Sequence, residues 1–160
     1  MRRGLTPFSG FRKWGLTPFL FALLTACSSG DFGYDAKADP FALLESAKTQ
    51  ARAEGKRILV VAGGEWCSSC RHLHDFLEDE PATQALLDRT FVQVHVYIGD
   101  ENFNDRFFAT LPSSRFVPHY WILSDEGTVL GEQDPEELEL EDSDDYDAER
   151  FARFAQGWSI

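Results

Sequence analysis

Two cysteines, Cys67 and Cys70, lie between a predicted strand and a predicted helix. The run 57–62 before them is short, apolar and rich in β-branched residues, and two glycines end it, which is typical of a strand covered on both faces. After the pair, apolar residues recur at helical spacing: Leu73, Phe76 and Leu77. The pattern predicts that Cys67 begins a helix and that Cys70 follows one turn later on the same side.

This position favours thiol chemistry at Cys67. A helix N-terminus presents unpaired backbone N–H groups and the positive end of the helix dipole, and both stabilise a thiolate, so we expect a lowered pKa for Cys67. Cys67 would attack a disulfide, and Cys70 would resolve the mixed disulfide that forms. The strand–loop–helix context also predicts that the pair is exposed. A purely structural disulfide is the alternative, but closing so short a loop would stabilise the fold very little.

Residues 1–26 have the pattern of an export signal. Four basic residues precede the apolar stretch 14–24, which ends in small residues and is too short to span a bilayer comfortably. The stretch leads into Leu24-Thr25-Ala26-Cys27, which resembles the lipobox of bacterial lipoproteins. That resemblance implies cleavage before Cys27 and acylation of its thiol, which leaves 27–39 as a tether and 40–160 as the folded domain. An ordinary secretory signal is the alternative.

The lipobox resemblance also implies a location. Two or more acyl chains hold a protein stably on a membrane, so we expect the chain in the cell envelope, on the periplasmic side, with the lipid bilayer as a partner of Cys27. Ser28, rather than an aspartate, follows that cysteine, which favours the outer membrane if the organism is Gram-negative. With Cys27 acylated, the other two cysteines can pair with each other, and an oxidising compartment lets such a disulfide persist.

Length and charge limit the remaining possibilities. Cleavage before Cys27 would leave 134 residues, enough for one domain, and would remove four basic residues and no acidic ones, which changes the net charge from −12 to −16. Nucleic acid is therefore not an expected partner. Eleven acidic residues fall within 132–149, which we interpret as a solvated loop. Divalent cation binding there is the alternative, although the tract lacks the ligand spacing of an EF-hand.

The rest of the chain predicts alternating helices and strands. Asp39 and Pro40 are typical of a helix start, Gly55 of a helix end, and Pro81 of a helix that breaks and restarts. The expected further elements are a strand over 90–97, a short helix over 105–111, strands over 119–123 and 128–130, and a closing amphipathic helix around 151–158. This order, a parallel pair followed by a hairpin, predicts a single α/β domain whose mixed sheet has helices on both faces.

With these elements in place, the chain resembles the thioredoxin superfamily over about residues 40–158. The resemblance is carried by the strand that leads into Trp66-Cys67-Ser68-Ser69-Cys70, by the strand 91–96 and by Val117-Pro118 before the hairpin. It is closest to small periplasmic thioredoxin-like lipoproteins and to the C-terminal domain of DsbD-type disulfide reductases. The resemblance implies a thiol–disulfide oxidoreductase that reduces disulfides in client proteins, needs no cofactor and is regenerated by a membrane electron donor.

The same resemblance implies roles for residues outside the cysteine pair. Pro118 would be a cis-proline that faces the disulfide, Val117 would pair through its backbone with an extended substrate segment, and Trp66 would border the groove and shield the disulfide. Trp66 could instead simply pack.

The chain also departs from the family pattern at several positions. Thioredoxins carry a buried aspartate six residues before the first cysteine, where this chain has Val61. Glu65 is a nearby candidate to replace it. His119 follows the proline where thioredoxins have threonine, and it could either place a positive charge near Cys67 or cap a strand edge. Ser68-Ser69 leaves the redox direction open.

Metal handling is the main alternative function. Cysteine sulfur and the imidazoles of His72 and His74 suit copper(I) or zinc. However, the two histidines are two residues apart on a helix and point to different sides, so at most one could join the cysteines. No second cysteine pair is present to complete a zinc site, so we predict no bound metal. His95 alternates with apolar residues in a strand and is expected to pack or to face solvent.

Overall fold

The computed structural model describes residues 32–143 and 145–160. The expected signal peptide and Cys27 lie outside this part of the chain. The described elements, in chain order, are α1 (Pro40–Glu54), β1 (Arg57–Gly63), α2 (Ser68–Asp79), α3 (Pro81–Thr90), β2 (Phe91–Tyr97), α4 (Asp105–Phe108), β3 (His119–Leu123), β4 (Val129–Gln133), the 3-10 helix η1 (Pro135–Leu138) and α5 (Ala148–Gly157). Within these residues, no helix is both long and apolar enough to cross a membrane.

The sheet has the strand order β2-β1-β3-β4. β1 pairs in parallel with β2 and antiparallel with β3, and β3 and β4 form an antiparallel hairpin. The central strand β1 is buried from Ile58 to Gly63, as its apolar run predicts for a strand covered on both faces. The mixed sheet with a parallel pair and a hairpin is therefore confirmed.

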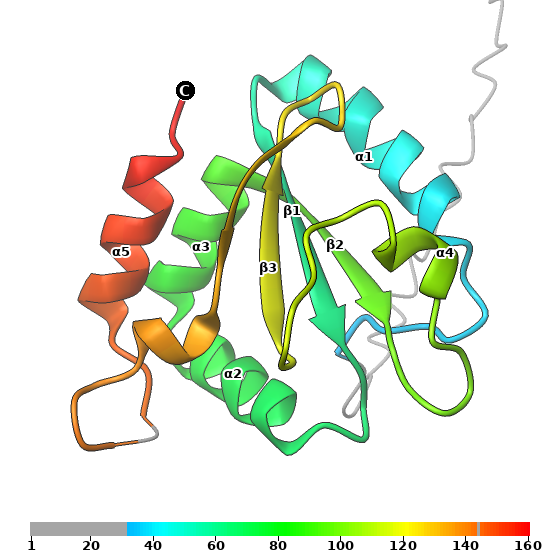
Figure 1. The fold of residues 1–160 in the computed structure, drawn as a ribbon. Helices are drawn as coiled ribbons and strands as arrows, with labels where there is room; N and C mark the ends of the chain where they lie inside the picture. The colour runs from blue at the N-terminus through cyan, green and yellow to red at the C-terminus, as the bar shows by residue number, and fades with distance from the viewer. Residues whose placement is uncertain (1–31, 144) are drawn as a thin grey trace, which may run out of the picture.

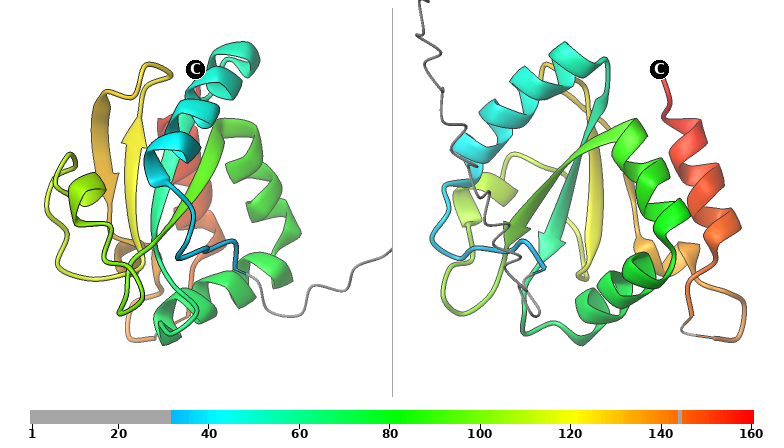
Figure 2. Two further views of the ribbon diagram at one scale, coloured as in Figure 1. Left: turned by 90° about the vertical axis from the view of Figure 1, so that its right-hand side faces the viewer. Right: turned by 180° about the vertical axis from the view of Figure 1, so that it is seen from behind.

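Helices cover both faces of this sheet (Figure 1). One face packs on α2, α3 and α5 through a cluster of apolar side chains that includes Val61, Tyr120 and Phe151. The other face packs on α1 and α4 through a second cluster that includes Val60 and Trp121. The view from behind in Figure 2 shows the two groups of helices on opposite sides of the strands.

The helix boundaries follow from the expected local signals. Asp39 caps α1, because its side chain accepts a hydrogen bond from the Phe41 N–H at 3.0 Å, and Gly55 ends the helix with a left-handed φ of 64°. Pro81 starts α3 directly after α2, as predicted. Three boundaries differ from the prediction: α4 ends at Phe108 and continues only as single turns, the last strand runs on to Gln133, and α5 already begins at Ala148.

The segment 132–149 is more ordered than the solvated loop that its charge predicts. Its first two residues belong to β4, and η1 follows with Leu138 buried in the core. Tyr146 is buried as well and forms an isolated β-bridge with Glu139. The few apolar residues between the carboxylates are therefore what attach this segment to the domain.

The described part of the expected tether also packs on the domain. We call residues 32–38 the strap; it is the blue segment beside the ends of β1 and β2 in Figure 2. Phe32 is buried, and its N–H donates a 3.2 Å hydrogen bond to Glu65. The Asn102 side chain donates to the Ala36 carbonyl at 3.0 Å. Among the described residues, the packed part of the chain therefore begins before residue 40 and includes Phe32.

Candidate functional site

The two cysteines lie where β1 ends and α2 begins. The chain turns after Gly63, with the Cys67 N–H bonded to the Gly64 carbonyl at 3.1 Å, and Cys67 is the N-cap of α2. Cys67 and Cys70 form a disulfide with their Cα atoms 5.2 Å apart. The Cys67 sulfur also accepts the Cys70 N–H at 3.1 Å. This is the arrangement at a helix N-terminus that stabilises a thiolate once the disulfide is reduced.

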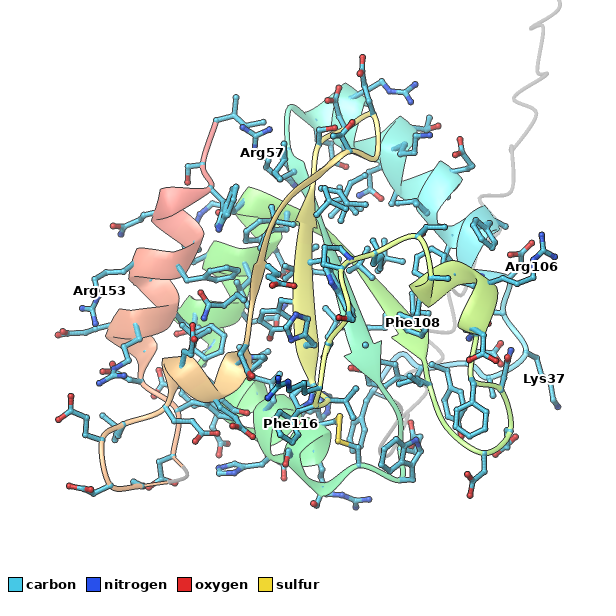
Figure 3. The ribbon with its side chains drawn as sticks, viewed as in Figure 1. Lys37, Arg57, Arg106, Phe108, Phe116 and Arg153 are labelled. Carbon is cyan, nitrogen blue, oxygen red and sulfur yellow. A yellow bond between two sulfur atoms is a disulfide. The ribbon has the colours of Figure 1, made fainter. Side chains whose placement is uncertain are left out.

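The cysteine pair is less exposed than the strand–loop–helix pattern predicts. Cys67 is only 5% exposed and Cys70 only 3%. The segment before β3 contributes to this cover, because the Val117 carbonyl oxygen lies 3.7 Å from the Cys67 sulfur. Figure 3 shows the yellow disulfide beside the labelled Phe116, at the start of that segment. The Val117 backbone therefore forms one side of the surroundings of the Cys67 sulfur.

The peptide bond between Val117 and Pro118 is cis, as the family resemblance implies. Pro118 directly precedes β3, so this bond lies where β3 enters the sheet next to β1. Together with the Val117 contact to Cys67, the geometry places the Val117 backbone next to the reactive sulfur.

An apolar groove of about 720 Å³ lies beside Val117. Its rim carries three large side chains that are more than half exposed: Trp66, Phe103 and Phe116. Trp66 is held in place because its indole N–H donates to the Ile98 carbonyl at 2.7 Å. Trp66 therefore borders this groove, which neither cysteine lines, and can contact an apolar segment laid along it.

Glu65 does not occupy the place of the missing buried acid. Val61 fills that position and is 3% exposed. Glu65 is exposed, and its carboxylate accepts the Phe32 N–H of the strap. It does not line the cavity behind Cys70. Its role in the structure is to hold the strap.

His119 lies on the face of the sheet that carries Trp121. Its ring centroid is 4.6 Å from that of Trp121, and its Nε2 lies 3.5 Å from a carboxylate oxygen of Glu132 without a hydrogen bond. Tyr120, the next residue in β3, lines the cavity behind Cys70 on the opposite face. The observed contacts of His119 thus connect β3 to β4, and none of them joins it to either cysteine.

The other histidines are dispersed. His72 lies 3.9 Å from Asp145 and His74 lies 3.4 Å from Glu78, so the two point to different sides of α2, as predicted. In residues 32–143 and 145–160, no three His, Cys, Asp or Glu side chains are grouped so that they could hold a metal ion.

The structure adds one residue that the sequence interpretation missed. Tyr34 of the strap reaches the buried side of Cys70: a Cβ placed on Gly63 would be 2.6 Å from the Tyr34 hydroxyl and 2.8 Å from the Cys70 sulfur. The distance between the Tyr34 hydroxyl oxygen and the Cys70 sulfur therefore cannot exceed the sum of those two distances. Two aromatic residues, Phe32 and Tyr34, in an otherwise small and polar stretch were the available signal. Side chains of this size need a surface to cover them.

Comparisons with known proteins agree with this fold. A family model described as thioredoxin-like matches residues 39–124, more than half of the chain. Nine chains of solved structures match; one is a disulphide isomerase from Xylella fastidiosa Temecula1, with a TM-score of 0.63, 24% identity, and coverage of 76% of this chain and 95% of that one. A search of curated protein sequences gives no match.

The fold and the disulfide together define the class. A mixed sheet with helices on both faces, a cysteine pair at the start of the helix after β1 and a cis-proline before β3 form a thioredoxin-like architecture. The chain belongs to the thioredoxin-like family. Membership and the cysteine pair support thiol–disulfide oxidoreductase activity in general.

Proposed function

We propose that this protein is a membrane-tethered, extracytoplasmic thiol–disulfide oxidoreductase that reduces disulfides in client proteins. The tether rests on the lipobox-like sequence at Cys27, and the observation that carries the exchange activity is the position of Cys67. It caps α2, its sulfur lies 3.7 Å from the Val117 carbonyl next to the cis-proline, and an apolar groove adjoins that segment. The exposed Trp66 and Phe116 on the rim favour a client whose reactive cysteine is flanked by apolar residues in an extended segment.

The reaction has two exchange steps. The Cys67 thiolate attacks a client disulfide, so that a Cys67–client bond forms, the client's own S–S bond breaks, and the released client sulfur takes a proton from solvent. The Cys70 thiolate then attacks the Cys67 sulfur, which re-forms the Cys67–Cys70 disulfide and releases the second client thiolate. Two electrons have passed from the protein to the client. A membrane-embedded dithiol donor would return the protein to its reduced form.

Cysteine variants test this proposal. With dithiothreitol as the reductant, the wild type should accelerate the reduction of insulin, measured as turbidity, because Cys67 supplies a thiolate at a helix N-terminus. Cys67→Ser should abolish the acceleration, whereas Cys70→Ser should accumulate mixed disulfides that are visible on a non-reducing gel. Cys27→Ser is the matched control, since it removes the remaining cysteine without touching the pair. Equal activity in all four proteins would contradict the proposal.

The redox direction needs a separate measurement. Equilibration with glutathione gives the reduction potential of the Cys67–Cys70 pair. A value near −270 mV, as in thioredoxin, is expected for a reductase, whereas a value near −120 mV would instead make the protein an oxidant.

A further inference from the structure

In the resolving step Cys70 must lose its proton, and this chain lacks the buried aspartate that thioredoxins place near the second cysteine. Cys70 is 3% exposed, and burial in apolar surroundings raises the pKa of a thiol. Only the thiolate can attack the mixed disulfide on Cys67. A thioredoxin-type buried carboxylate is missing here, because Val61 occupies that position and Glu65 faces the strap.

A cavity of about 310 Å³ adjoins the buried side of Cys70. Its titratable groups come from four elements: Tyr34 from the strap, His74 and Glu78 from α2, His95 from β2 and Tyr120 from β3. Glu78 lies 3.4 Å from His74 at the outer end, and its side chain is mostly exposed. The Tyr34 ring packs 5.1 Å from that of His95. Of these groups, the Tyr34 hydroxyl is the one that shares the space over Gly63 with the Cys70 sulfur.

The protonation states of these groups determine which of them can stabilise the Cys70 thiolate. Burial, and then the charge on His74, lowers the pKa of His95 to about 4, so His95 is a weak acceptor for a thiol proton. Burial raises the pKa of Tyr34, so its hydroxyl keeps its proton throughout the neutral range. A neutral hydroxyl beside a sulfur atom is a permanent donor, and a hydrogen bond to a charged acceptor is among the stronger ones in proteins.

We propose that Tyr34 is a positioning residue for the resolving step: its hydroxyl donates a hydrogen bond to the Cys70 thiolate and so compensates for the buried acid that this chain lacks. The Cys70 proton passes to water before the attack. The thiolate then forms the bond to the Cys67 sulfur, the Cys67–client bond breaks, and the client sulfur leaves with the electron pair. This inference rests on the proposed function.

A hydroxyl donor and a carboxylate have opposite effects on the pKa of Cys70. A nearby carboxylate disfavours the Cys70 thiolate by charge repulsion and acts by accepting its proton, whereas a donor favours the thiolate directly. Removing the donor should therefore raise the pKa of Cys70. The nucleophilicity of a thiolate rises with the pKa of its thiol, with a Brønsted coefficient of about 0.4–0.5. At neutral pH this increase recovers part of the rate that the variant loses through its smaller thiolate fraction. At high pH, where both proteins are fully ionised, the variant should resolve the mixed disulfide faster than the wild type.

The experiment follows the release of glutathione from a mixed disulfide on Cys67, prepared in full-length protein, as a function of pH. Cys67 does not titrate in this species, so the profile reports Cys70. In Tyr34→Phe, which keeps the ring, we expect the midpoint of the profile to rise by about one pH unit. Release should be about threefold slower at pH 7 and about threefold faster on the alkaline plateau, so that the two profiles cross.

Two controls separate this inference from packing and from the proposed function. Tyr146→Phe removes a hydroxyl from another buried tyrosine of the same apolar cluster, and its profile should match the wild type. Coincident profiles for Tyr34→Phe and the wild type, or a midpoint that moves to lower pH, would overturn the proposed role of Tyr34 and leave the proposed function standing. If the wild-type mixed disulfide releases no glutathione at any pH, the proposed function itself fails.

Discussion

At the scale of single residues, the buried side of Cys70 has the geometry of a thioredoxin site but different polar groups, because the buried aspartate of thioredoxins is missing. The β1 residue that faces this space is Val61, and the polar groups come instead from other segments, among them Tyr34 of the strap and His95 of β2. His95 contributes no charge near neutral pH, because burial lowers its pKa to about 4. This neutrality links the stability of the domain to pH.

The sign of that linkage follows from proton binding. The unfolded chain binds a proton at His95 near pH 6.5, whereas the folded protein does so only near pH 4, so the unfolded state is favoured as pH falls through this window. Relative to His95→Gln, the wild type should lose about 2.5 kcal/mol of unfolding free energy between pH 7.5 and pH 4.5. Urea unfolding at each pH measures this difference. His72→Gln, at a half-buried position on α2, is the control. A wild-type-to-His95→Gln difference that stays constant with pH would show that His95 binds its proton equally well in the folded and unfolded states.

At the scale of elements, the strap is the part of the molecule that the sequence pattern did not reveal. Phe32 packs with its ring 4.5 Å from that of His74, and the Arg71 guanidinium lies 5.6 Å above the Phe32 ring. The helices and strands were predictable because their signals are local, such as Asp39 and Pro40 at the start of α1 or Pro81 between α2 and α3. The strap contacts join residues that are more than thirty positions apart, which no local signal reports.

Removing the anchor of the strap should release it without unfolding the sheet, because short terminal segments open more easily than the core. We expect Phe32→Ala to raise the rate of trypsin cleavage after Lys37 at least tenfold, since a loss of about 1.4 kcal/mol increases the open population by that factor. Mass spectrometry of the products measures the site and the rate. Phe41→Ala, at an exposed position of α1, is the control and should leave the rate unchanged. Equal rates for Phe32→Ala and the wild type would mean that the remaining contacts hold the strap.

The acidic segment shows the same limit of local signals. Most of the described acidic side chains in it are exposed, as their charge predicts. The burial of Leu138 and Tyr146 depends on their packing in the cluster that contains Phe151, and α5 brings that residue from beyond the segment.

The site shows a comparable division: the positions of Cys67, Cys70 and Pro118 followed from the sequence, whereas the cover over Cys67 depends on the fold of residues 116–118.

At the scale of the whole molecule, the order β2-β1-β3-β4 brings the cysteine pair and the cis-proline together, because β1 and β3 are neighbours in the sheet. The Cys67 contact with Val117 joins two segments fifty positions apart along the chain. The site is therefore a product of the complete sheet, which explains why the family resemblance, and not the local pattern, implied the role of Pro118.

The proposed attachment to a membrane is also a property of the whole chain. If Cys27 is acylated, Cys27→Ser should move the protein from the membrane fraction to the soluble fraction, because the acyl chains supply the apolar surface that binds the bilayer. Fractionation of cells that express the wild type and the variant, followed by immunoblotting, measures the shift. Ser29→Ala, two residues further on, is the control and should stay with the membrane. A wild type that is already soluble would contradict the lipoprotein interpretation.

If Cys27 is acylated, the docked strap limits how far the domain can lie from the membrane. Only four residues separate Cys27 from Phe32, which is fixed against the helix that starts at the disulfide. A fully extended chain spans at most about 3.6 Å per residue, so an acylated Cys27 would lie within about 18 Å of Phe32. Such a protein would operate at the level of the lipid headgroups, and its clients would have to come to the bilayer surface to be reduced.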